Sequence, residues 1–517
     1  MTVRLLDCTL RDGGYVNEWK FGARTIGQVV HNLTNACIDF IEIGFMKSTP
    51  YDENKSLFRY LSDFKKFIPV DRKKSKYYGM ITFGDYALED IPDNDGSSVD
   101  GLRIIFKKKQ KAEALDYCRK VKKKRYELFI NPTFTDQYSD RELLDLIDEV
   151  NTIHPTGFSI VDTMGVMSAE NLVRMFMLID HNLKKDIKVC FHSHNNLQQS
   201  FMNAVALIDL HSDRELIIDV SVMGMGRGAG NLNAELMISY LNEHCNTKYD
   251  LLPILKIADE HITKIFSQTP WGYSMPYFLA ASSSCHPNYA SYLIDKQTIS
   301  IEAINSILMR IPEQKKASYD VELIKQLYLE YQENAVDDTA VLNTLKEEVS
   351  SKPVLIIAPG KTIETHKAEI GNFILSRKPF VISLNFIPEK IRTDKVFISS
   401  PKRFAELTDL SKAVLTSNIK ADGVPTLNYA SYLNNSEMFD NSALMLLCVL
   451  IKLGITEVWT AGLDGFAKDK NNYANTDMIL NSKVGEFDKR NEIMREMLDR
   501  FSKKIKVHFL TPSEYQK

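Results

Sequence analysis

Two histidines separated by one residue give the strongest chemical signal in the sequence. His192 and His194 follow a short apolar run, Lys188–Phe191, which has the composition of a buried strand. Residues two apart on a strand project to the same side, so both imidazoles would face one point. Two neutral imidazoles that converge in this way suit a divalent metal ion. Histidine pairs are also common in cores and on surfaces, so the pair alone leaves a structural role open.

Two other segments offer groups that a metal enzyme uses. Asp7–Gly14 reads DCTLRDGG and supplies a carboxylate for a metal and a guanidinium for an anionic substrate, although a capped turn with a surface ion pair would also explain it. Gly224–Asn231 reads GMGRGAGN, and its four glycines permit positive φ and a close approach of the backbone to a ligand. A dinucleotide fingerprint would belong to a first strand–helix turn instead. We therefore predict a loop that lines a site.

These segments need elements that bring them together. Short apolar runs alternate with amphipathic stretches such as Arg24–Ala36 and Arg141–Asn151 in the first 225 residues. This alternation predicts parallel βαβ units, and eight such units close a (β/α)₈ TIM barrel, in which strands 1, 7 and 8 are neighbours. An open, doubly wound sheet is the alternative. The eight strand candidates are Val3–Leu6, Phe40–Ile43, Tyr77–Thr82, Leu102–Phe106, Glu127–Ile130, Phe158–Val161, Lys188–Phe191 and Leu216–Val222.

The remaining chain divides into two further regions. We expect a barrel domain at 1–250, a helical extension at 251–350 and a smaller C-terminal α/β, Rossmann-like domain at 351–517, where strand candidates resume. In the last region Ala358–Thr362 and Ala461–Gly465 each follow a strand candidate. Structural turns are the simpler interpretation of both, and a phosphorylated ligand such as a nucleotide-sugar is the alternative. The amphipathic segment Val321–Val336 needs a surface to cover it, so we also expect a homo-oligomer.

Composition narrows the class of protein. Of 517 residues, 44% are hydrophobic and 25% charged, which is typical of a globular chain. The 64 basic and 67 acidic residues nearly balance and give no reason to expect a nucleic-acid or membrane partner. The longest apolar run, Ala443–Ile451, is too short for a membrane span. Charged residues near the N-terminus replace the apolar stretch of a signal peptide, and seven scattered cysteines fit reduced thiols. We expect a cytoplasmic protein.

The three motifs together resemble one family. TLRDGG, HSHNN and MGRGAGN, in this order over about residues 1–290, resemble the DRE-TIM metallolyases, the HMG-CoA lyase-like group, and most closely its 4-hydroxy-2-oxovalerate aldolase branch. The resemblance implies Asp12, His192 and His194 as ligands of Mn²⁺ or Mg²⁺. It places Asn231 at a position that joins the coordination sphere in some members. Arg11 matches the arginine that steadies the enolate oxygen.

The resemblance also implies roles for residues outside the three motifs. Glu42 matches a glutamate on strand 2 that is common in the group, and Thr163 lies where the aldolases use a small hydroxyl residue near the substrate carboxylate. Tyr273 and Tyr277 are both candidates for a tyrosine that the aldolases contribute to the site. Taken singly, each of these residues fits a packing or capping role equally well.

One position departs from the aldolase pattern. The aldolases carry a histidine shortly after RDG as a catalytic base, whereas Tyr15 follows Gly14 here. A tyrosine with an ordinary pKa near 10 is a poor base at neutral pH. The base, the substrate or the direction of the reaction must therefore differ from the aldolase.

These observations predict a metal-dependent carbon–carbon lyase. A divalent ion chelated by a pyruvate-like 2-oxo acid would act as a Lewis acid toward its enolate, and the second small-molecule substrate would be an aldehyde, for example one derived from a sugar. A Claisen-type acyl-CoA synthase of the same superfamily is one alternative, although no acyl-CoA pocket is evident in the sequence. A metal-binding scaffold without turnover is the other, and Tyr15 is the feature that favours it.

Overall fold

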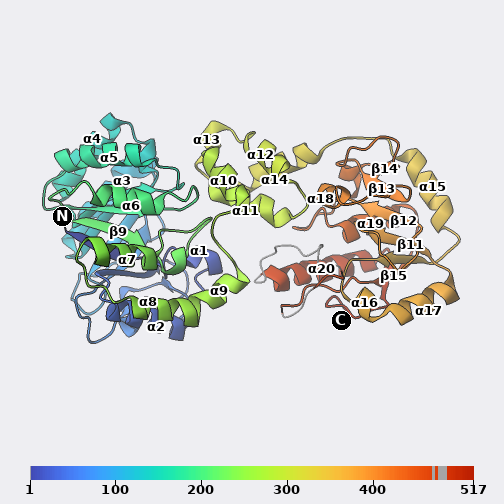
Figure 1. The fold of residues 1–517 in the computed structure, drawn as a ribbon, viewed down its shortest axis with the longest axis horizontal. Coiled ribbons are helices and arrows are strands. Elements are labelled where there is room, and N and C mark those ends of the chain that lie inside the picture. The colour runs from blue at the N-terminus through green and yellow to red at the C-terminus, as the bar shows by residue number, and fades with distance from the viewer. Residues whose placement is uncertain (1, 469–471, 475–485, 517) are drawn as a thin grey trace. The chain divides into compact units, whose positions relative to one another are not determined.

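The computed structural model describes residues 2–468, 472–474 and 486–516. The chain forms two compact units (Figure 1). The first comprises Met1–Ser291 and Glu313–Tyr319, and the second comprises Tyr292–Pro312 and Asp320–Lys517. Both are built around parallel sheets.

The first unit is a closed barrel. Eight parallel strands pair in sequence order, and β1 pairs with both β2 and β9, which closes the ring. The closure confirms the predicted barrel and excludes the open sheet. The barrel strands are β1 Val3–Asp7, β2 Phe40–Met46, β4 Lys76–Thr82, β5 Gly101–Phe106, β6 Glu127–Pro132, β7 Gly157–Asp162, β8 Lys188–Ser193 and β9 Leu216–Val220, and the short β3 Leu57–Phe58 extends β2 at the side.

Helices cover the outside of the barrel at most of its strand connections. In α2, apolar residues three and four apart, Ile26, Val29 and Val30, are buried, as expected of an amphipathic helix. Ser139 and Glu142 form a capping box that starts α4. The helices of this layer are α1 Gly14–Asn17, α2 Ala23–Asn35, α3 Lys111–Lys123, α4 Asp140–Ile153, α5 Ala169–Asn182, α6 Ser200–Ile208 and α7 Ala234–His244.

Two connections depart from strict strand–helix alternation. The chain between β2 and β4 contains the 3₁₀ helix Leu61–Phe67, and the chain between β4 and β5 contains only the 3₁₀ turn Leu88–Asp90. The second connection is rich in Asp, Gly, Pro and Ser, which favour turns over a continuous helix.

The barrel interior is apolar at one level and charged at the next. The apolar level is a cluster of Leu6, Cys8, Phe40, Tyr78, Phe129, Cys190 and Ile217. Two residues further along three of these strands, the alternation of strand side chains places Glu42, His192 and Asp219 on the same inner side, and Arg103 joins them from β5. This charged level lies toward the carboxyl ends of the strands, where barrel enzymes carry their sites.

The chain from Leu251 to Val349 is helical, as the sequence predicts. In α14 the side chains of Ile324, Leu327 and Tyr328 are buried within the second unit, so this segment needs no second copy of the chain to cover its apolar side. The helices are α8 Leu251–Ile257, α9 Thr263–Gln268, α10 Met275–Ser282, α11 Pro287–Lys296, α12 Ile301–Leu308, α13 Glu313–Lys316, α14 Val321–Gln332 and α15 Thr339–Val349, with a π turn between α8 and α9.

The second unit is a doubly wound α/β fold, which confirms the predicted fold class. Its strand order is β14-β13-β12-β11-β10-β15-β16, all parallel, so the winding reverses between β10 and β15. The edge strand β14 is only two residues long. The strands are β10 Val354–Ile357, β11 Phe380–Leu384, β12 Lys395–Ile398, β13 Ala413–Thr416, β14 Thr426–Leu427, β15 Glu457–Ala461 and β16 Lys506–Phe509; the helices are α16 Thr362–Thr365, α17 Lys367–Arg377, α18 Pro401–Phe404, α19 Ser442–Lys452 and α20 Phe487–Ser502.

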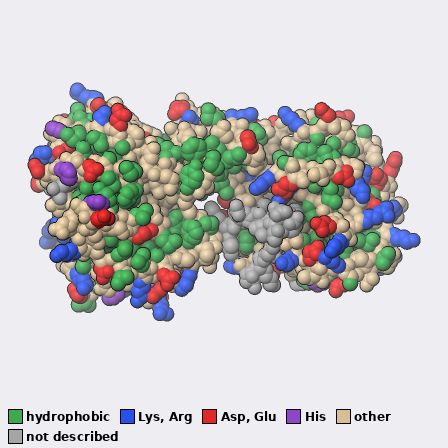
Figure 2. All heavy atoms as spheres, viewed as in Figure 1, with side chains coloured by type: hydrophobic (Ala, Val, Ile, Leu, Met, Phe, Trp, Pro, Cys, Tyr) green, Lys and Arg blue, Asp and Glu red, His purple; other side chains and the backbone are tan. Residues whose placement is uncertain are grey.

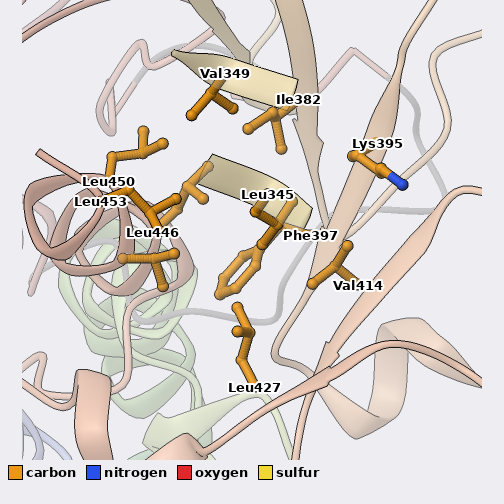
Figure 3. Close-up of a pocket in the computed structure, with 11 residues that line it drawn as sticks. Leu345, Val349, Ile382, Lys395, Phe397, Val414, Leu427, Leu446, Leu450 and Leu453 are labelled. Atoms are coloured by element: carbon orange, nitrogen blue, oxygen red, sulfur yellow. The ribbon is translucent and has the colours of Figure 1, made fainter. Parts of the chain in front are cut away.

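A small pocket lies in this unit between the sheet and helices α15 and α19 (Figure 3). Its wall is aliphatic and aromatic apart from Lys395, whose ammonium pairs with Glu348 at 3.3 Å. Its volume of about 10 Å³ is at the lower limit for a single water molecule. The pocket is therefore a packing gap, with no room for a ligand.

The surface carries charges of both signs. Figure 2 shows basic and acidic side chains interspersed over the described residues on that face. No helix in the described part of the chain is long and apolar enough to cross a lipid bilayer.

Candidate metal centre

The structure brings together the three residues that the motifs single out as metal ligands. One ligand atom each from Asp12, His192 and His194 lies within 4.8 Å of the others. Asp12 is held in a tight turn after β1, where its backbone N–H donates to the carbonyl of Cys8 at 2.8 Å. His192 lies on β8 and His194 directly after it, so strand alternation points both rings the same way, with centroids 5.1 Å apart.

An oxygen atom faces Nδ1 of each imidazole. His192 Nδ1 lies 3.1 Å from Asp219 Oδ2, and His194 Nδ1 lies 3.1 Å from the carbonyl oxygen of Asp162. With Nδ1 facing an oxygen, Nε2 of each ring is left to bind a metal. His194 Nε2 already lies 3.4 Å from Asp12 Oδ2. Histidines that ligate metals are oriented in this way by their second nitrogen.

Asn231 lies beside the carboxylate of Asp12. Its amide nitrogen donates to Asp12 Oδ2 at 2.9 Å and to the carbonyl of Met225 at 3.1 Å. Its Oδ1 is buried and has no hydrogen-bond partner among the described residues. A buried oxygen without a partner is rare in native structures unless an ion or water meets it. Two imidazoles and a carboxylate are donors that suit a divalent metal ion.

Arg11 lies beside these donors. Its Nε donates to Glu42 Oε2 at 2.7 Å, and its Nη1 donates to Asp12 Oδ1. Burial raises the pKa of Asp12, but the charges of Arg11 and of the two imidazoles outweigh burial and hold that pKa well below its usual range. Asp12 is therefore an ionised carboxylate, the form that binds metal.

A buried chain of charges that the sequence analysis missed supports the centre. Arg103 is fully buried, and its Nη2 donates to Asp219 Oδ2 at 2.7 Å while its Nη1 lies 3.3 Å from Glu42 Oε2. The ion pairs thus run from Arg11 through Glu42, Arg103 and Asp219 to His192. A signal was present, because Arg103 and Asp219 are charged residues within the apolar runs of two predicted strands.

The other predicted site residues make different contacts. Thr163 Oγ1 accepts a hydrogen bond from the backbone N–H of Phe134 at 2.8 Å. Tyr273 is 54% exposed and its hydroxyl faces the sulfur of Met275, while the hydroxyl of Tyr277 lies 3.1 Å from Ser291 Oγ. In the described part of the chain the structure records no contact between either tyrosine and Asp12, His192 or His194. Their roles stay predictions.

Tyr15, the departure from the aldolase pattern, belongs to an aromatic cluster. Its ring packs edge-on against Trp19 and Phe45, with centroids 4.8 and 6.1 Å away. The guanidinium of Arg227 lies 3.9 Å from the centre of the Tyr15 ring. The residue is 40% exposed, at the same end of the barrel as Asp12, to whose carbonyl its N–H donates at 3.2 Å.

Comparison with known proteins agrees with this geometry. Residues 105–260 match the family model described as HMGL-like. Oxaloacetate decarboxylase of Mycobacterium tuberculosis is 24% identical over 273 residues, which are 52% of this chain and 79% of the relative. The 4-hydroxy-2-oxovalerate aldolase of Geobacillus genomosp. 3 is 22% identical over 261 residues, 50% of this chain and 76% of the relative.

Solved structures also resemble this chain over about half of its length. The N-terminal domain of a candidate aldolase from Bacteroides vulgatus is 24% identical, with a TM-score of 0.49 over 58% of this chain and 98% of that one. The HMG-CoA lyase of Brucella melitensis is 12% identical, with a TM-score of 0.41 over 50% of this chain and 96% of that one. Its motifs, the family match and its relatives support a place for the barrel part of this chain among the DRE-TIM metallolyases, near the 4-hydroxy-2-oxovalerate aldolase branch.

Proposed function

We propose that the barrel is an aldolase, or a related lyase, that makes or breaks a carbon–carbon bond through the enolate of a pyruvate-like 2-oxo acid. The observation that carries the proposal is the convergence of Asp12, His192 and His194 within 4.8 Å at the end of the barrel where such enzymes carry their sites. We propose Mn²⁺ or Mg²⁺ as the ion, with Asn231 as a fourth ligand. When bound, this ion would supply Lewis-acid chemistry to the oxygens of the 2-oxo acid.

Arg11 is placed to stabilise the negative charge of the enolate. Its guanidinium is hydrogen-bonded on two sides, to Asp12 and to Glu42. It therefore needs little reorganisation as negative charge develops on the substrate. A donor of this kind forms charge-assisted hydrogen bonds, which are stronger than those between neutral groups. Glu42 Oε2 already accepts from Arg11 and faces Arg103, so we assign Glu42 as a positioning residue for Arg11.

We retain Thr163 and Tyr273 as proposed substrate contacts. Thr163 Oγ1 accepts from the N–H of Phe134, which leaves the hydroxyl proton available to donate to a substrate carboxylate. Tyr273 is exposed, so a contact with substrate would require the segment around it to move when substrate binds.

The half-reaction can be tested before the second substrate is known. In D₂O with Mn²⁺ or Mg²⁺ the protein should exchange the methyl protons of pyruvate for deuterium, which NMR detects. Chelation of the metal should stop the exchange, and His194→Ala should slow it by about 100-fold or more because a ligand is lost. Arg141→Gln, on the outer face of α4, is the matched surface control. Exchange no faster than in buffer with the metal alone would reject the proposal.

A decarboxylase is a second candidate because one relative carries that name. Loss of CO₂ from oxaloacetate leaves the same pyruvate enolate, so the site described here would serve both reactions. Measuring the loss of oxaloacetate against aldol addition to pyruvate distinguishes them. Release of thiol from acetyl-CoA would instead favour the Claisen-type synthase.

A further inference from the structure

A second cationic group lies at the mouth of the barrel outside the proposed metal set. Arg227 is half-buried, with its guanidinium over the ring of Tyr15 and its Nη1 3.2 Å from Nε2 of His286. Most cations around the barrel pair with a carboxylate, but no ion pair is recorded for Arg227 in the described part of the chain. A planar guanidinium that lies over an aromatic face and beside an imidazole, with no acidic partner recorded among the described residues, is suited to bind an anion.

The loop that carries Arg227 is joined to the metal centre. The N–H of Gly230 donates to the carbonyl of Arg227 at 3.0 Å, and the carbonyl of Gly230 accepts from Asn195 at 2.7 Å, next to His194. Arg227 is four residues before Asn231, and Tyr15 is three residues after Asp12. Arg227 and Tyr15 therefore belong to the same two loops as the proposed ligands Asn231 and Asp12.

His286 comes from the segment that covers this loop. Pro287 packs against Gly228, and the N–H of His286 donates to the carbonyl of Lys316 at 2.8 Å, while its Nδ1 accepts from the N–H of Asn288 at 3.2 Å. Burial and the charges of Arg227, His194 and Lys107 lower the pKa of His286 to about 3. The imidazole is thus neutral, and the uncompensated charge at this place is positive.

We propose that Arg227, Tyr15 and His286 form a subsite for an acidic group, a carboxylate or a phosphate, on the second substrate. The inference rests on the proposed function, in which the carboxylate of the 2-oxo acid binds the metal ion. The acidic group at Arg227 would therefore belong to the second substrate. It also gives Tyr15 a role other than that of a base, because its ring holds the guanidinium in place. The aldehyde partner would then be an acidic one, such as a phosphorylated or carboxylated sugar fragment.

Binding of three matched probes tests the subsite. The full chain, loaded with Mn²⁺ and saturated with oxalate in place of the 2-oxo acid, is titrated calorimetrically with glycerol 3-phosphate, glycerate or glycerol. One of the acidic probes should bind and glycerol should not, and the acid that binds identifies the group as phosphate or carboxylate. Arg227→Gln should weaken that binding by about 10- to 100-fold, and Arg227→Lys should recover only part of it because a point charge lacks the planar fork. Arg141→Gln, with the same change in charge on the outer face of α4, should bind like the unaltered protein.

The outcomes separate the subsite from the proposed reaction. Pyruvate exchange by the unaltered protein needs no second substrate and reports the reaction alone. A protein that exchanges pyruvate protons but binds no acidic probe better than glycerol overturns the subsite, and so does equal binding by Arg227→Gln. Arg227-dependent binding supports the subsite, and if exchange is absent it is the aldolase proposal that fails.

Discussion

Each imidazole at the centre has an oxygen atom facing its Nδ1. Asp219 faces His192 Nδ1 and also accepts from Arg103, so one carboxylate holds both a proposed ligand and a fully buried cation. Nδ1 of each imidazole faces a different oxygen atom. The positions of the ligands therefore depend on residues that would not touch the metal.

Asp219→Asn tests this dependence. The amide keeps the size of the side chain but removes the charge that His192 and Arg103 face, so we expect Mn²⁺ affinity to fall by about 10- to 100-fold. Calorimetric titration with Mn²⁺ measures it. Asp186→Asn, at an exposed ion pair with His154, is the control. An unchanged affinity in Asp219→Asn would mean that His192 is oriented without Asp219.

Arg11→Lys tests the enolate role of Arg11. The guanidinium contacts Asp12 and Glu42 at once, and a lysine ammonium cannot reproduce both contacts and also face the substrate. We expect pyruvate exchange to slow by about 100-fold while one Mn²⁺ per chain still binds. Exchange at the unaltered rate would remove Arg11 from the mechanism.

Asp7 predicts a pH dependence of stability. Burial, and then the nearby carboxylates of Glu42 and Asp219, raise its pKa to about 7 against the hydrogen bonds from Thr9. The folded protein thus holds this proton more tightly than the unfolded chain does, so the stabilisation is present below the unfolded pKa near 4 and is lost as pH rises toward 7. The free energy of unfolding should fall by about 1.4 kcal/mol per pH unit in this window.

Thermal unfolding of Asp7→Asn at pH 5 and pH 8, with EDTA present, measures the effect. The asparagine is neutral at both values, so its advantage over the unaltered protein should grow as pH rises. A difference that does not change with pH would show that Asp7 keeps an ordinary pKa.

The sequence predicts the proposed metal ligands, but it does not predict the buried charged residues that contact them. Asp12, His192 and His194 lie at or just after strand ends in recognisable motifs, and closure of the barrel brings these strand ends together. Arg103 and Asp219 lie inside strands, where the apolar pattern predicts core side chains, and their pairing depends on strand register that the sequence does not reveal. The contact between Tyr15 and Arg227 joins two distant loops and could not be predicted either.

At the level of elements, all eight barrel strands were predicted, because each is a short β-branched run. The connections were harder. A helix was expected after every strand, but the chain after β4 is rich in turn-forming residues and forms a single 3₁₀ turn. Hydrophobic periodicity indicates where helices are favoured. A barrel can nevertheless close when one of its connections has no helix.

The loop after β9 depends on its glycines. Gly230 has φ of +84°, and a Cβ there would lie 2.1 Å from the carbonyl oxygen of Gly224. Gly230→Ala should therefore displace Asn231, with a cost of about 1–3 kcal/mol in strain and a measurable loss of Mn²⁺ affinity. Gly27→Ala, in the middle of α2 with its nearest neighbour at 3.9 Å, is the matched control and should bind Mn²⁺ normally. If the Gly230 variant also bound normally, the loop would not position the ligand.

At the level of the whole molecule, the chain has two α/β units, and all the proposed ligands lie in the first. A ligand that binds only the folded state stabilises the unit that holds it, by about 2.7 kcal/mol at 100 times its dissociation constant. Scanning calorimetry with and without Mn²⁺ should show a rise in the unfolding temperature of the barrel unit only. Hydrogen exchange read by mass spectrometry assigns each transition to its unit. Equal protection of both units would contradict a site confined to the barrel.

In the second unit, the alternation of strands and helices predicts the fold but does not identify a functional site. Its parallel, doubly wound sheet was predicted from alternating strands and helices, and its strand order reverses between β10 and β15, next to Gly360 and Gly462. The carbonyl of Gly462 accepts from the N–H of Gly360 at 2.9 Å, and Asp464 accepts from the N–H of Thr362 at 2.8 Å. These bonds tie the two glycine segments together as turns, and a phosphorylated ligand there stays a prediction.

The central claim is that Asp12, His192 and His194 hold one divalent ion. Pulsed electron paramagnetic resonance of the Mn²⁺-loaded protein tests it directly, because histidine nitrogens bound to Mn²⁺ give characteristic couplings. The structure predicts one Mn²⁺ per chain coupled to two imidazole nitrogens, one coupling lost in His192→Ala or in His194→Ala, and weakened binding in Asp12→Ala. Bound Mn²⁺ without nitrogen coupling, or couplings that survive in both histidine variants, would contradict it.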